Sequence, residues 1–188
     1  MFVGAGAYCE SIPAETQRDD ELITIKGGRE RGLVIHKLLE EVLTGETKES
    51  SDTLETRART LLSEIGVAEA DRVEKGPHAP ELAASVRRAL AIPEVVVLRP
   101  RLLPEMTIFS AGPAAQETIY IGGIADALAL DEGGLVDVVV DWKSDIDPAI
   151  AVVELYREQV RDYLAATGSK EGLLVFVTSG RVERVTPR

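Results

Sequence analysis

The segment 135–143, Leu-Val-Asp-Val-Val-Val-Asp-Trp-Lys, limits the possible folds more than any other stretch of the chain. Side chains of a β-strand alternate between the two faces of a sheet, so every second residue shares a face. One face would be wholly apolar and predicts the core side; it holds Val136, Val138, Val140 and Trp142. The opposite face would carry Asp137, Val139, Asp141 and Lys143. The segment therefore predicts a strand that packs on one face and presents an aspartate and a lysine together on the other.

Helical spacing of apolar residues dominates the chain before this strand region, and a second helical pattern follows it. We expect an irregular segment at 1–28 and one domain at 29–188, with a helical part at about 29–92 and a sheet with a helix at about 95–188. The expected helices are 29–43, 54–65, 80–91 and 147–166, and the expected strands are 95–98, 101–109, 117–130, 135–143, 173–178 and 181–186. This order predicts a mixed α/β fold.

Composition places the chain among ordinary globular proteins. It has 188 residues, 45% of them hydrophobic, and a net charge of −11. Such an acidic chain is not typical of a non-specific nucleic-acid coat, although a local basic track can lie on an acidic body. The single cysteine excludes an internal disulfide and any metal or iron–sulfur site built from cysteines. The N-terminus lacks signal-peptide features and no apolar run reaches membrane length, so we expect a cytoplasmic protein without membrane contact.

The hairpin that precedes Asp141 brings a second carboxylate near it. A tight turn that pairs Leu130 with Leu135 would place Asp126 diagonal to Asp141 on the neighbouring strand. Diagonal neighbours lie about 7–8 Å apart at the backbone, so the two carboxylates can share one divalent cation. A lysine beside such an ion can orient water or stabilise charge on a phosphate. The hairpin therefore predicts a metal site with Lys143 beside it.

Four motifs occur in an order that resembles a known family. They are Arg31-Gly32-Leu33-Val34-Ile35-His36-Lys37-Leu38-Leu39-Glu40, Gly123-Ile124-Ala125-Asp126, Asp141-Trp142-Lys143 and Gln159-Val160-Arg161-Asp162-Tyr163. Together they resemble the PD-(D/E)XK nuclease superfamily in its RecB/AddA-like branch, whose nuclease domains are found at the C-terminus of UvrD-like helicases. Ala125 stands where the superfamily's name has proline. The resemblance implies a restriction-endonuclease-like core, αβββαβ, with a mixed central sheet flanked by helices and an N-terminal helical region.

The same resemblance implies roles for individual residues. Asp126, Asp141 and Lys143 would be the catalytic residues, and a Mg²⁺ or Mn²⁺ ion would be held by the metal ligands His36, Asp126, Asp141 and the Trp142 backbone carbonyl. The residues expected to guide DNA or support the site are Gln159, Tyr163, Tyr156, Glu105, Glu40 and Arg161. No iron–sulfur cluster is expected, and no phosphate-binding loop of a helicase motor occurs in the sequence.

The function implied is a metal-dependent deoxyribonuclease that hydrolyses phosphodiester bonds. We expect an exonuclease on single strands in DNA end processing or repair, with a helicase motor in the parent chain or as a separate partner. Basic residues could form a phosphate track around the site; they are Lys26, Arg29, Arg31, Arg87, Arg88, Arg99, Arg101, Arg157 and Arg161. Scattered surface charges are the other interpretation of these residues.

Three plainer interpretations stay open. Asp126 and Lys143 could form a structural ion pair without catalysis. Packing alone would explain Tyr156 and Tyr163, although not the glutamine between them. The whole domain could be a catalytically silent nuclease-fold module that binds DNA or a helicase partner.

Overall fold

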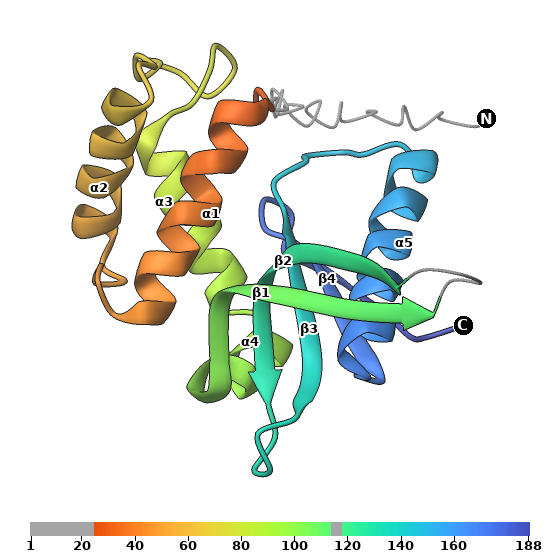
Figure 1. The fold of residues 1–188 in the computed structure, drawn as a ribbon. Coiled ribbons are helices and arrows are strands. Elements are labelled where there is room, and N and C mark those ends of the chain that lie inside the picture. The colour runs from red at the N-terminus through yellow and green to blue at the C-terminus, as the bar shows by residue number, and fades with distance from the viewer. Residues whose placement is uncertain (1–24, 114–117) are drawn as a thin grey trace, which may run out of the picture.

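The computed structural model describes residues 25–113 and 118–188, so most of the irregular segment expected at 1–28 lies outside the described residues. One mixed sheet has the strand order β1-β2-β3-β4-β5, in which only the β3–β4 pair is parallel. Helices α1 to α4 pack on one face of this sheet and α5 packs on the other (Figure 1). The expected α/β fold, a mixed central sheet flanked by helices with an N-terminal helical region, is confirmed.

The three predicted N-terminal helices are present with small shifts at their ends. They are α1 (Arg29–Thr44), α2 (Ser51–Glu64) and α3 (Ala79–Leu90). Gly45 ends α1 in the left-handed conformation (φ 82°), which residues with a Cβ adopt reluctantly. The hydroxyl of Ser50 accepts a hydrogen bond from the Thr53 amide and begins α2. No helix in the described part of the chain is both long and apolar enough to cross a membrane.

The strand predicted at 95–98 is wrong, because these residues lie in helix α4 (Pro93–Leu98). Proline suits the first turn of a helix, and Val95 and Leu98, three residues apart, are buried while the valines between them are exposed. A short apolar run does not by itself distinguish a strand from a helix. A single 3₁₀ turn, Arg99–Arg101, then leads into β1 (Leu102–Pro113), which confirms the next predicted strand.

The predicted hairpin between β2 (Thr118–Leu130) and β3 (Val136–Lys143) is confirmed, but its register is wrong. Leu130 pairs with Val136 rather than Leu135, and a register shift beside it leaves Ala127 opposite Val140. The turn is longer than expected because the Asp131 carboxylate accepts hydrogen bonds from the amides of Gly133 and Leu135. One step beyond the Ala127–Val140 pair, Asp126 is therefore level with Asp141 instead of diagonal to it.

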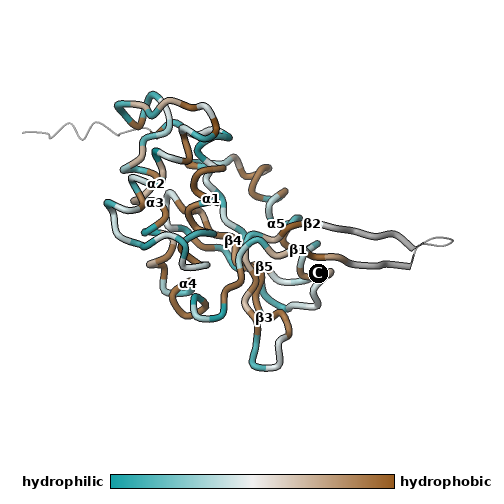
Figure 2. The backbone as a smooth tube through the Cα atoms, turned by 60° about the vertical axis from the view of Figure 1, so that its left-hand side comes forward, coloured by the Kyte–Doolittle hydropathy of each residue, from teal (hydrophilic) through white to brown (hydrophobic). Residues whose placement is uncertain are grey.

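The predicted core face of β3 is confirmed, but the opposite face is covered as well, which the sequence pattern did not predict. Val138, Val140 and Trp142 pack with the helical region, whereas Val139 packs with residues of α5 (Ile150–Thr167). The parallel strand β4 (Glu171–Phe176) requires a crossover helix, and α5 supplies it before the edge strand β5 (Arg181–Val185). Figure 2 colours much of β3 as hydrophobic, in agreement with its burial on both faces of the sheet. Asp141 and Lys143 lie at the C-terminal end of this buried strand, beside α1 and α5.

Candidate active site

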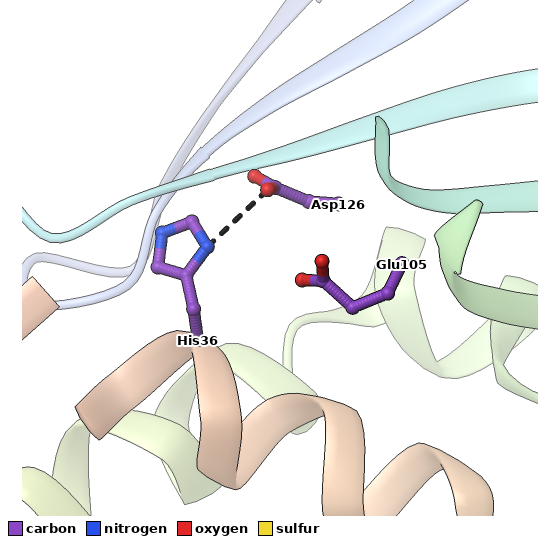
Figure 3. Close-up of side chains that lie close together, drawn as sticks. All are labelled: His36, Glu105 and Asp126. Carbon is purple, nitrogen blue, oxygen red and sulfur yellow. Dashed lines mark ion pairs between the residues drawn. The ribbon is translucent and has the colours of Figure 1, made fainter. Parts of the chain in front are cut away.

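His36 on α1 meets Asp126 on β2. The Nδ1 atom of His36 lies 3.2 Å from Oδ1 of Asp126 (Figure 3). The second oxygen of Asp126 accepts a hydrogen bond of 2.7 Å from the Trp142 amide on β3. Burial alone would lower the pKa of His36, but the hydrogen bond and negative charge of Asp126 outweigh burial and raise that pKa above its usual value. Asp126 therefore joins α1, β2 and β3 at one point.

Glu105 brings a third potential ligand from β1. One ligand atom from each of His36, Glu105 and Asp126 lies within 4.8 Å of the other two, close enough to hold a metal ion. Figure 3 shows the Glu105 carboxylate directed toward the other two side chains. The backbone of Glu105 has φ 53°, a conformation that costs a residue other than glycine about 1–3 kcal/mol. Desolvation and the charge of Asp126 raise the pKa of Glu105 above its usual value.

Asp141 at the end of β3 is almost wholly buried, with 2% of its surface exposed. Its Oδ2 atom forms an ion pair with Nζ of Lys143 at 2.8 Å, and no other group of the described residues hydrogen-bonds to this buried oxygen. Burial and the charge of Asp126 raise the pKa of Asp141 to about 6, against the lowering effect of Lys143. A buried carboxylate with a single lysine partner is costly to the fold, and its charge suits a cationic ligand.

Lys143 is held from three sides. Besides Asp141, its ammonium donates a hydrogen bond of 3.2 Å to the side-chain oxygen of Gln159 and lies 4.5 Å from the centre of the Tyr156 ring. The Tyr156 hydroxyl donates to Asp145 at 2.9 Å. Burial and this hydrogen bond raise the pKa of Tyr156 to about 12. The contacts of Tyr156 are therefore more than the packing that one sequence interpretation proposed.

Gln159 and Tyr163, one turn apart on α5, connect the helix to β2. The Gln159 amide donates to the Tyr163 hydroxyl at 3.3 Å, and that hydroxyl donates to the Ile124 carbonyl at 2.9 Å. A Cβ added to Gly123 would lie 3.0 Å from the Tyr163 ring, so only glycine fits without displacing the ring. The motif before Asp126 and the motif on α5 are thus in direct contact.

A family model for the PD-(D/E)XK nuclease superfamily matches residues 13–182, which include every site residue described above. The chain belongs to this superfamily. Among matching solved structures, the crystal structure of SSO0001 shares 18% sequence identity, covers 86% of this chain and 80% of that one, and has a TM-score of 0.42. No curated protein matches the chain.

The residues present fit the divalent metals that PD-(D/E)XK nucleases typically use. The donor set combines one imidazole with carboxylates, and oxygen ligands suit hard cations such as Mg²⁺ and Mn²⁺. The buried carboxylate of Asp141 lies beside this set, and burial together with the charge of Asp126 raises the pKa of both Glu105 and Asp141. A cation in the site would relieve each of these costs.

Two predicted site residues make their hydrogen bonds within their own helices. Glu40 accepts a hydrogen bond of 2.9 Å from Lys37 on its own helix, and Arg161 donates one to Glu158, also on its own helix. Neither contact reaches His36 or Lys143. Most residues of the predicted phosphate track likewise have partners within the chain, as do Arg87, Arg88, Arg99, Arg101 and Arg157.

The expectation that Arg31 contacts DNA is wrong, since only 1% of its surface is exposed. Its guanidinium donates to Glu81 on α3, to the carbonyl of Ser144 and to the Thr178 hydroxyl. Ser144 directly follows Lys143, so Arg31 fixes the end of β3 against the helical region. Sequence reasoning missed this role, although Arg31 falls three and four residues before the buried Val34 and Ile35, on the same helix face.

Proposed function

We propose that this member of the superfamily is a metal-dependent nuclease that hydrolyses phosphodiester bonds in DNA. The observation that carries the proposal is the buried Asp141–Lys143 ion pair, which lies level with the His36–Asp126 pair. The plainer interpretation of Asp126 and Lys143 as a structural ion pair is not favoured, because Lys143 pairs with Asp141 while Asp126 meets His36 and Glu105. The four motifs of the sequence also favour the RecB/AddA-like branch.

In this proposal the metal ligands are His36, Asp126, Asp141 and the Trp142 backbone carbonyl, with Glu105 as a supporting carboxylate. A bound Mg²⁺ or Mn²⁺ ion would supply Lewis acidity and lower the pKa of a coordinated water. Lys143 orients the attacking water or stabilises the charge that builds on the phosphate. Because Asp141, Gln159 and the Tyr156 ring contact its ammonium, Lys143 is held in place before the substrate arrives.

The finer parts of the proposal concern the substrate and its delivery. We infer that residues 29–188 form one nuclease domain that acts on single strands as an exonuclease during DNA end processing, in the cytoplasm. The net charge of −11 makes tight binding to DNA by this chain alone unfavourable. A helicase motor in the parent chain or as a separate partner would supply the strand and much of the affinity. Gln159 and Tyr163 would line the path of the DNA strand.

End-labelled single-stranded and duplex DNA, incubated with Mg²⁺, Mn²⁺ or EDTA, tests the nuclease directly. We expect cleavage that requires the metal and is lost in Lys143→Ala. Lys170→Ala is the matched control, because Lys170 is an exposed lysine outside the site. Absence of cleavage by a folded, metal-binding protein, with and without a helicase, would overturn the proposal in favour of a silent nuclease-fold module. Products of one nucleotide would support exonuclease action, and internal fragments would contradict it.

A further inference from the structure

Two apolar side chains, Phe109 on β1 and Ile124 on β2, are exposed beside the candidate active site. They lie on the hairpin formed by the antiparallel strands β1 and β2. Phe109 is 74% exposed and Ile124 is 56% exposed. The strand register pairs Ile124 with Thr107 and Phe109 with Gly122, so Phe109 and Ile124 are diagonal neighbours. Diagonal neighbours lie within reach of an aromatic side chain. We call Phe109 and Ile124 the apolar pair.

The apolar pair lies on the hairpin face that turns away from α5. The residues that alternate with the pair, Ile108 and Gly123, both face α5. Ile108 is buried in the cluster that contains α5 residues, and Gly123 directly contacts the Tyr163 ring. Because side chains alternate along a strand, Phe109 and Ile124 point to the opposite face.

The same hairpin face carries the ligands of the candidate metal centre. Asp126 lies two residues after Ile124 on β2 and faces His36 on α1. At a rise of about 3.4 Å per residue, Ile124 is about 7 Å from Asp126 along the strand. Phe109 pairs with Gly122, two cross-strand pairs further out than Ile124, and is about 14 Å from Asp126 along the strand direction by the same rise. An exposed apolar surface thus extends outward from the metal ligands.

We propose that the apolar pair is a stacking platform for an unpaired base of the strand whose phosphate lies at the metal centre. This inference rests on the proposed nuclease function. Bases stack on exposed aromatic side chains regardless of sequence, so the pair offers a surface to a base that flanks the cut phosphate. The pair suits one base better than a protein partner, since a specific protein interface needs about 800 Å² from each side. Paired bases in a duplex are already stacked on each other, so the platform selects single strands.

The test measures binding of a labelled single strand and of a blunt duplex in the Lys143→Ala background with Mg²⁺, so that the strand is not cut. We expect Phe109→Ala to weaken single-strand binding about tenfold and to leave duplex binding unchanged. The dependence of affinity on salt should keep its slope, because no phosphate contact is lost. Phe109→Trp should retain the affinity. Val97→Ala is the control, because Val97 is 72% exposed on α4, away from the hairpin.

Unchanged single-strand binding in Phe109→Ala overturns the platform, as does an equal loss on duplex or a parent protein that binds no single strand. Circular dichroism and thermal unfolding show whether Phe109→Ala remains folded, and rescue by Phe109→Trp excludes a general loss of structure. Cleavage by the wild-type protein is measured separately. A tenfold loss of binding in Phe109→Ala, with no cleavage by the wild-type protein, would support the platform and contradict the nuclease. Cleavage by the wild-type protein, with unchanged binding in Phe109→Ala, would support the nuclease and contradict the platform.

Discussion

Glu41 in the helical region and Asp141 in the sheet are both buried carboxylates, with 3% and 2% of their surfaces exposed, but their surroundings differ. Glu41 receives hydrogen bonds from the Arg57 guanidinium through both oxygens and another from the Thr47 hydroxyl. Asp141 has one partner for its buried Oδ2 among the described residues, the ammonium of Lys143 at ion-pair distance. Arg57 lowers the pKa of Glu41 despite its burial, while burial and Asp126 raise the pKa of Asp141 to about 6.

This difference separates a carboxylate that stabilises the fold from one that the fold holds at a cost. The hydrogen bonds of Glu41 are complete within the chain, and they join α1 to α2. Around Asp141, by contrast, the carboxylates of Asp126 and Glu105 gather with it, and its own cationic partner is Lys143. Folded proteins keep such costs mainly where function requires them. The comparison therefore predicts opposite consequences when each carboxylate is replaced by its amide.

Asp141→Asn gives the largest expected effect, and it falls on activity. The substitution keeps the shape but removes the charge that would bind the cation, so cleavage should drop about 100- to 1,000-fold. Without metal, the free energy of unfolding should not fall, since a buried charge facing Asp126 disappears. Single-turnover cleavage and urea unfolding in EDTA measure the two quantities. A loss of stability with activity retained would place Asp141 in the same class as Glu41.

Metal binding should stabilise the protein through the site that contains Asp141 and should not depend on Glu41. A ligand at 100 times its Kd raises the free energy of unfolding by about 2.7 kcal/mol. We expect Mn²⁺ to raise the unfolding temperature of the wild-type protein and of Glu41→Gln, but not of Asp126→Ala. Thermal unfolding with and without EDTA measures the shift. An equal shift in Asp126→Ala would mean that the ion binds elsewhere.

The same contrast explains what the sequence could predict. Period-two alternation and helical spacing identified β2, β3 and α5, and motif order identified His36, Asp126, Asp141 and Lys143 as one group, which the structure brings together. Local patterns could not predict the hairpin register, because the Asp131 side chain lengthens the turn. They also could not predict the buried partners of Arg31, which come from α3 and from chain segments more than 100 residues away. Long-range hydrogen bonds leave no periodic signal.

Glu41→Gln should have the smallest of these effects, and it falls on stability. The amide leaves Arg57 without its carboxylate partner, so the free energy of unfolding should fall by about 2 kcal/mol at neutral pH, less than for a fully buried pair because Arg57 is partly exposed. Cleavage per folded molecule should be unchanged, since Glu41 faces Arg57 on α2, whereas His36 on the same helix faces Asp126 in the candidate metal site. Urea unfolding gives the stability, and Glu64→Gln, at the exposed end of the same network, is the control.

The pH dependence of this loss tests its electrostatic origin. Because the pKa of Glu41 is lowered in the folded protein, its contribution is complete above the unfolded value of about 4.3 and disappears as the pH falls through the folded pKa. The stability gap between wild type and Glu41→Gln should therefore be full at neutral pH and close in acid. A gap that stays constant down to about pH 3 would mean that shape, rather than the charge of Glu41, stabilises the contact of α1 with α2.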